Sequence, residues 1–191
     1  MKDIEAILKD AFKEATEVYN SINNYAVEIG VIENKPRDKK TETVEAKKDD
    51  GSKVKLKITT SADITNAELM YIHENGSPKR GLPARPVLDY TIAYTSKKLL
   101  PETLKRIEDG CFNKNWSKED VRLELDKMCK RMQNYARQLI YSNDGRLKRN
   151  ATSTVLLKGF NHPLFKTGQL ARSITCRLID ITNISEWLHI K

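Results

Sequence analysis

The chain has 191 residues, of which 31% are charged and 39% hydrophobic, and 34 Lys and Arg against 26 Asp and Glu leave a net charge of +8. This composition is typical of an ordinary globular protein of about one domain, and no run of about 18 apolar residues is present that could span a membrane. The alternating charges of Met1–Glu5 do not resemble a secretory signal peptide. We therefore expect no secretion and no membrane partner.

The first third of the chain predicts a helix followed by strands. Apolar residues recur at steps of three and four over residues 4 to 22, which indicates an amphipathic helix. A two-residue period over 26 to 33 predicts a strand. Strands at 42 to 48 and 53 to 60 flank a turn signal at Asp49–Ser52 and should form a hairpin. Its alternating lysines indicate a solvated or edge-protecting face, with a partner-binding face as the alternative.

The middle of the chain predicts helices. Thr65 and Glu68 have the spacing of a capping box, and this short helix should end at Gly76. After a loop rich in Pro and Gly, Pro86 suits the first turn of another helix, because its missing N–H costs nothing there. Pro101 should kink or divide that second helix.

The longest predicted helix begins after Ser117, with Asp120 completing its cap, and ends near Asn143–Gly145. Its apolar positions step by three and four and are Val121, Leu125, Met128, Met132, Tyr135 and Leu139. The segment 172 to 180 alternates in polarity and predicts the last strand.

These elements predict an α+β fold in which a mainly antiparallel β-sheet packs against an N-terminal helix and a long helical segment. The sheet would contain the strands near 26 to 33, 42 to 48, 53 to 60 and 172 to 180. We expect a single domain over residues 1–191, with a protruding charged β-hairpin at about 35–60.

The three cysteines, Cys111, Cys129 and Cys176, are odd in number, far apart and form no C-x-x-C pair. We interpret them as reduced thiols that act as small buried apolar side chains.

No motif for catalysis or for binding a cofactor or a metal is complete. His73-Glu74-Asn75-Gly76-Ser77 resembles the start of a zinc protease motif, but Ser77 stands where the second histidine ligand should be. No glycine-rich phosphate loop and no nucleophile elbow occur. We therefore expect no cofactor, no metal and no enzyme.

The positive charge favours one alternative, a basic nucleic-acid-binding module. Charge is the weakest part of that signature, however, and the sparse tyrosines fall mostly on predicted apolar helix faces rather than on a stacking platform. A solvated basic surface is the other interpretation of the same residues.

Two stretches carry a resemblance to a known family. The first is Tyr71-Ile72-His73-Glu74-Asn75-Gly76-Ser77-Pro78 followed by Leu82-Pro83-Ala84-Arg85-Pro86-Val87-Leu88. The second is Thr154-Val155-Leu156-Leu157-Lys158-Gly159 followed by His162-Pro163-Leu164-Phe165-Lys166-Thr167-Gly168-Gln169-Leu170-Ala171-Arg172-Ser173-Ile174. In this order they resemble motif blocks of the neck and tail-completion proteins, or virion morphogenesis proteins, of long-tailed double-stranded-DNA bacteriophages. The chain departs from the family pattern at Asn75, at Phe165-Lys166 and in its long charged hairpin.

The resemblance implies a structural virion protein at the head-tail junction, acting in neck formation, tail completion or tail termination. Such a protein would be made in the bacterial cytoplasm and located in the virion. Its implied partners are further copies of itself in a ring, six by resemblance, together with other neck, connector, tail-tube or terminator proteins. DNA would pass through the lumen of the ring.

The two blocks also supply the candidate interface residues. Arg85 is predicted either to anchor a subunit interface or to staple its own loop, because its guanidinium can bind two oxygens at once. Thr167-Gly168 predicts a tight turn that leads into the last strand, on whose surface Arg172 and Ser173 should lie. Together with the terminal Trp187, the candidates are His73, Glu74, Gly76, Pro83, Arg85, Pro86, Thr167, Gly168, Leu170 and Ser173.

Overall fold

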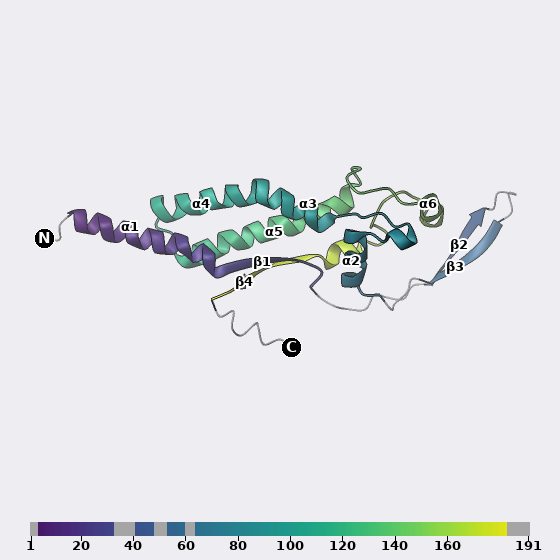
Figure 1. Ribbon diagram of the computed structural model, residues 1–191, viewed down its shortest axis with the longest axis horizontal. Helices are drawn as coiled ribbons and strands as arrows, with labels where there is room; N and C mark the ends of the chain where they lie inside the picture. The colour runs from purple at the N-terminus through teal and green to yellow at the C-terminus, as the bar shows by residue number, and fades with distance from the viewer. Residues whose placement is uncertain (1–3, 33–40, 48–52, 60–63, 183–191) are drawn as a thin grey trace. The chain divides into compact units, whose positions relative to one another are not determined.

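The chain divides into two units that alternate along the sequence. The computed structural model describes residues 4–32, 41–47, 53–59 and 64–182 (Figure 1). Unit 1 combines Met1–Ile29, Thr91–Asn134 and Cys176–Lys191, and unit 2 combines Gly30–Tyr90 and Tyr135–Thr175. The single domain over 1–191 and the protrusion of the hairpin stay predictions.

The described residues of unit 1 include helices α1 and α4, most of α5 and a small sheet. Helix α1 (Ile4–Asn20) is followed by a 3-10 turn (η1, Ser21–Asn24) and then by strand β1 (Tyr25–Gly30). Helix α4 (Leu100–Asn113) is followed by α5 (Lys118–Ser142), whose last residues belong to unit 2. Strand β4 (Thr175–Asp180) runs antiparallel to β1 (Figure 1), and the Ile181 N–H donates to the Asn24 carbonyl over 2.8 Å.

The core of unit 1 lies where α4 and α5 meet the β1–β4 sheet. The predicted apolar stripe of α5 is confirmed here, because Val121, Leu125, Met128 and Met132 are all buried. The Ser117–Asp120 cap is also present, with the Ser117 N–H donating to the Asp120 carboxylate over 2.9 Å. Partly buried side chains from α1, β1 and β4 close the core, among them Val18, Tyr19, Val27, Cys176 and Leu178.

Pro101 divides the helical stretch as predicted. Helix α3 (Val87–Tyr94) passes into a π-helical segment (η3, Thr95–Leu99), and α4 then begins with Pro101 in its first turn. Because proline lacks an N–H and crowds the preceding turn, the backbone widens into a π-turn just before it.

Unit 2 contains short helices joined by loops. They are α2 (Asn66–Asn75), the 3-10 turn η2 (Pro78–Arg80), the start of α3, the end of α5, α6 (Thr152–Lys158) and α7 (Gln169–Ser173). The predicted capping box of α2 is confirmed, since the Thr65 hydroxyl accepts from the Glu68 N–H and the Glu68 carboxylate accepts from the Thr65 N–H. Helices α2 and α7 contact each other.

The predicted hairpin pairs β2 (Thr41–Lys47) with β3 (Lys53–Thr59) in antiparallel register, from Thr41 opposite Thr59 to Lys47 opposite Lys53. Glu45 lies opposite Lys55, and both side chains are exposed. The hairpin is therefore exposed to solvent at these two positions.

The α+β class is confirmed, with three corrections inside it. Among the described residues the four strands form two separate two-stranded sheets, β1–β4 and β2–β3, and not one sheet. Helix α6 was not expected. The last strand starts at Thr175, because the residues before it, Arg172 and Ser173 included, end the short helix α7.

Candidate functional site

The first motif block folds into a closed loop between α2 and α3. Gly76 ends α2 with φ +72°, and a Cβ at this position would lie 2.6 Å from the Ala84 nitrogen, so only glycine fits. Beyond it, Ser77 and Leu82 exchange two backbone hydrogen bonds of 2.8 and 3.0 Å. This bridge folds the half-buried Pro83 and its neighbours back against the end of α2.

Arg85 staples this loop to a second one. The residue is 3% exposed. Its Nε donates to the Lys148 carbonyl over 2.7 Å and its Nη2 to the Arg149 carbonyl over 2.9 Å, while its backbone N–H donates to the His73 carbonyl over 2.6 Å. Burial lowers the pKa of the guanidinium. Of the two predicted roles, the structure favours the internal staple.

Glu74 caps the helix that follows the loop. Its carboxylate accepts from the N–H groups of Leu88 and Asp89 over 3.1 and 2.9 Å, and negative charge is favourable at a helix N-terminus. Burial nevertheless raises the pKa of Glu74, and this effect exceeds the opposing one of the hydrogen bonds. Pro86 stands immediately before α3 and accepts from the Tyr90 N–H, as its predicted place at the start of a helix requires.

The second motif block begins in α6, which ends at Gly159 in the left-handed conformation. The half-buried Lys158 donates to the His162 carbonyl over 2.8 Å. Burial and the nearby charges of Arg85 and Lys166 lower the pKa of Lys158. The His162 ring stacks on Phe165, with centroids 4.6 Å apart.

The Thr167-Gly168 turn is present, but it starts a helix. Gly168 has φ +74° and stands at the N-cap of α7, and a Cβ there would lie 2.9 Å from Arg172. Leu170 is buried at 3% exposure, and the Ser173 hydroxyl donates to the Leu170 carbonyl over 2.7 Å. The predicted strand-surface positions of Arg172 and Ser173 are therefore wrong, because one helical turn satisfies these polar groups locally.

Arg137 is a second arginine staple that sequence reasoning missed. From α5, its guanidinium donates to the Ile174 carbonyl over 2.8 and 3.1 Å and to the Arg172 carbonyl over 3.1 Å. These carbonyls end α7, so a positive charge stands at a helix C-terminus, where it is favourable. In the sequence, the only indication of this role was a basic residue next to the apolar positions of a predicted helix.

The structure brings the two blocks together inside unit 2. Arg85 of the first block holds the loop that leads into the second, its charge acts on Lys158, and α2 contacts α7. His73 lies 3.5 Å from Arg85, between its Nδ1 and the Arg85 Nη1. Trp187 lies outside the described residues.

In this arrangement the residues of the two motif blocks fix the shapes of loops and helix ends. Within residues 4–32, 41–47, 53–59 and 64–182, no group of three or more His, Cys, Asp or Glu side chains is placed to hold a metal ion. In the same residues, no helix combines the length and apolar character that crossing a membrane requires.

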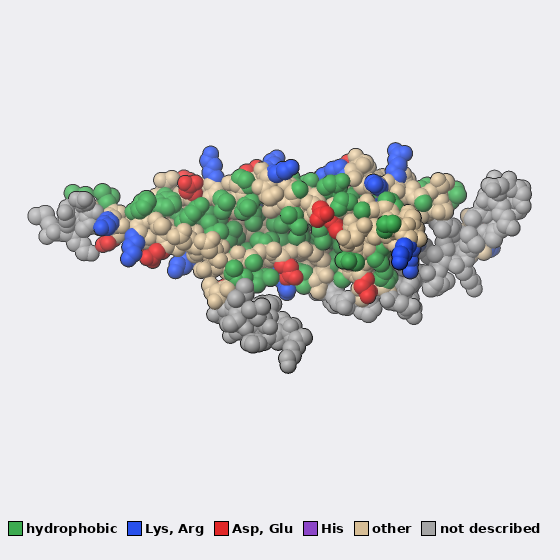
Figure 2. All heavy atoms as spheres, viewed as in Figure 1, with side chains coloured by type: hydrophobic (Ala, Val, Ile, Leu, Met, Phe, Trp, Pro, Cys, Tyr) green, Lys and Arg blue, Asp and Glu red, His purple; other side chains and the backbone are tan. Residues whose placement is uncertain are grey.

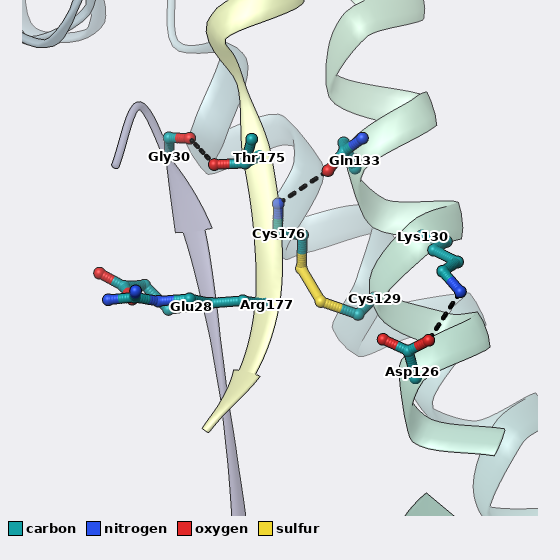
Figure 3. Close-up of a disulfide and its surroundings, with 9 residues drawn as sticks. All are labelled: Glu28, Gly30, Asp126, Cys129, Lys130, Gln133, Thr175, Cys176 and Arg177. Carbon is teal, nitrogen blue, oxygen red and sulfur yellow. Dashed lines mark hydrogen bonds and ion pairs between the residues drawn. A yellow bond between two sulfur atoms is a disulfide. The ribbon is translucent and has the colours of Figure 1, made fainter. Parts of the chain in front are cut away.

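The cysteine prediction is wrong for two of the three residues. Cys129 on α5 and Cys176 on β4 form a disulfide, with their Cα atoms 5.6 Å apart (Figure 3). The Cys176 N–H also donates to the Gln133 side chain over 3.0 Å. The pair lies 47 residues apart in sequence and meets only because β4 packs on α5. Cys111 is a free buried thiol, as expected, and burial raises its pKa.

Comparison with family models, with curated proteins and with solved structures finds no match to this chain.

Proposed function

We propose that this chain is a structural virion protein at the head-tail junction of a long-tailed bacteriophage, where it completes or terminates the tail in a ring of copies. The observation that carries the proposal is the pair of motif blocks, which occur in the family's order and lie in one unit.

The contacts of the block residues support a scaffold role. Arg85, Glu74 and Gly76 fix two loops and the start of α3, and Gly168 fixes the start of α7. Side chains that bind main-chain groups in this way set loop shape, and a ring subunit needs loops of fixed shape to meet its neighbours.

The test is deletion of the gene from the phage or phage-derived particle that encodes the chain. We expect electron micrographs to show unjoined heads and tails or aberrant tail ends, and wild-type chain supplied in trans should restore joined particles. Complementation with the Arg85→Ala variant should be weaker than with the matched exposed variant Arg80→Ala. Normal particles without the chain would refute the proposal.

One observation favours the alternative, a basic nucleic-acid-binding module. Residues 135–175 hold seven Lys and Arg (Arg137, Arg146, Lys148, Arg149, Lys158, Lys166 and Arg172) against the single acid Asp144. Lys148, Arg149 and Lys166 are exposed. Fluorescence anisotropy with short single- and double-stranded DNA tests this alternative. Submicromolar binding that weakens steeply with salt, and that Lys148→Glu with Arg149→Glu abolishes, would favour it over the ring.

A further inference from the structure

The disulfide between Cys129 and Cys176 lies where the chain leaves unit 1 and returns to it. Residues 135–175 belong to unit 2, Cys129 stands shortly before this segment, and Cys176 follows it directly. The bond between the two sulfurs therefore fixes the returning strand, β4, on the helix from which the chain departed, α5 (Figure 3).

The two cysteines differ in how a thiol from solution could reach them. Cys129 is completely buried, at 0% exposure, whereas Cys176 is half-buried. Cys176 is held in place by its neighbours, since its N–H donates to the Gln133 side chain over 3.0 Å and it packs, like Leu178, against the core of unit 1. A thiol can attack the Cys129 sulfur only after β4 has moved away from α5.

Attack on the Cys176 sulfur meets a different obstacle. Thiol–disulfide exchange at that sulfur releases Cys129 as a thiolate. Leu125 and Met132, one helical turn to either side of Cys129, are both buried, and hydrophobic side chains gather over α4 and α5 in Figure 2. A charged thiolate is disfavoured in such apolar surroundings, so exchange at Cys176 is also slow while β4 stays packed.

The cations next to the cysteines in sequence are engaged elsewhere. Lys130 pairs with Asp126 over 2.7 Å. Arg177 pairs with Glu28 over 2.5 Å, on the side of β4 that faces away from Cys129 (Figure 3). A lysine or arginine beside a cysteine stabilises its thiolate, and these two pairings prevent Lys130 and Arg177 from doing so.

We propose that the disulfide is a redox latch gated by β4, whose bond exchanges with small thiols only when β4 separates from α5. In the open state a thiolate attacks one sulfur and forms a mixed disulfide, and the other sulfur leaves and takes up a proton. A second thiolate then displaces the remaining protein sulfur, so that the chain gains two thiols and two reductant thiols become one disulfide. The reverse reaction, with a small disulfide as the oxidant, closes the latch.

The gate has a consequence for the folded chain, which keeps the redox state that it had when β4 packed on α5. A chain that folds as a dithiol stays reduced, and a chain that has formed the bond keeps it in a reducing solution. The latch does not depend on the virion role proposed above.

The test compares the folded chain with the urea-unfolded chain, each reduced by the same concentration of dithiothreitol. Alkylation and mass spectrometry count the free thiols, with the free Cys111 as internal reference. We expect the folded chain to react at least a hundredfold more slowly. Hydrogen exchange of the Cys176 and Ile181 amides, which bond to Gln133 and Asn24, should be slowed by a similar factor, and core amides of α5 by a larger one.

Two variants should open the gate. Leu178→Ala removes packing against the core of unit 1 and should speed reduction of the folded chain about tenfold. The matched Leu156→Ala, at a leucine of α6 that is 70% exposed, should leave the rate unchanged. Gln133→Ala removes only the acceptor of the Cys176 N–H and should speed reduction about threefold, which provides the same test if Leu178→Ala does not fold.

Three results would overturn the proposal. A rate for the folded chain less than a hundredfold below the unfolded rate would show that small thiols reach the disulfide without the gate. A factor equal to that of the slowest α5 amides would mean that reduction requires global unfolding and not the opening of β4. Equal rates for the wild type, Leu178→Ala and Gln133→Ala would show that the packing of β4 does not control the exchange.

Discussion

Replacement of Arg85 by alanine should destabilise unit 2 by about 3 kcal/mol. The guanidinium makes two side-chain hydrogen bonds, to the carbonyls of Lys148 and Arg149, and a hydrogen bond to a charged group is worth about 1.5–3 kcal/mol. Water can reach part of the freed loop, since both of these residues are exposed, which places the loss near the lower end of the sum. In a chain of this size the loss corresponds to a fall in Tm of roughly 6–12 °C.

The measurement is urea unfolding followed by far-UV circular dichroism, together with amide hydrogen exchange over the loop at 146–150. Arg85→Lys should lose about half as much, because lysine can reach one carbonyl but lacks the planar fork. Arg80→Ala, an exposed arginine five residues away, is the control and should change stability by less than about 0.5 kcal/mol. A loss below about 1 kcal/mol for Arg85→Ala, or one equal to that of the control, would refute the staple.

Three further predictions concern other contacts. Gly110→Ala should lower the Tm although alanine favours helices, because its Cβ would lie 2.1 Å from the Trp116 ring, and overpacking costs about 1–3 kcal/mol. Reduction of Cys129–Cys176, which closes a loop of 47 residues, should cost about 4 kcal/mol in urea unfolding. Glu74→Gln should make the free energy of unfolding depend less on pH. Because the pKa of Glu74 is raised in the folded state, the wild type should gain stability relative to Glu74→Gln as the pH falls through that pKa. It should lose this added stability as the pH rises through the same pKa.

Each of these has its own check. Gly110→Ala combined with Trp116→Leu should recover part of the lost Tm, and no recovery would mean that the clash is not with the ring. Thiol titration of the denatured chain should find one thiol before reduction and three after it, and three before reduction would contradict the disulfide. Parallel stability-pH curves for the wild type and Glu74→Gln would show that burial does not raise the pKa of this carboxyl.

Features set by neighbouring residues could be predicted from the sequence. Capping at Thr65 and Ser117 depends on residues three positions apart, and the apolar stripe of α5 repeats along a single helix. The break at Pro101 follows from the geometry of proline. In each case the physical cause lies within one or two helical turns.

Features set by distant residues could not be predicted in this way. Strand β4 pairs with β1, and Thr175 lies 145 residues after the Gly30 carbonyl to which it donates. Strand β4 also packs on α5, and this packing brings Cys176 to Cys129. For Arg85, the fork geometry predicted that it binds oxygens, but nothing in the sequence indicated the carbonyls 63 and 64 residues away. Seven residues were too few for α6 to show a helical period.

The alternation of the two units along the chain has a consequence for how the protein forms on the ribosome. Strand β1 is made early, but β4, which pairs with it, belongs to the last segment of unit 1. At about 5–20 residues per second, β1 waits roughly 7–30 s with its edge unpaired. All of unit 2 is synthesised within that interval, so unit 2 can be complete while unit 1 is still open. A nascent chain halted before Thr175 should accordingly expose the edge of β1 to other chains.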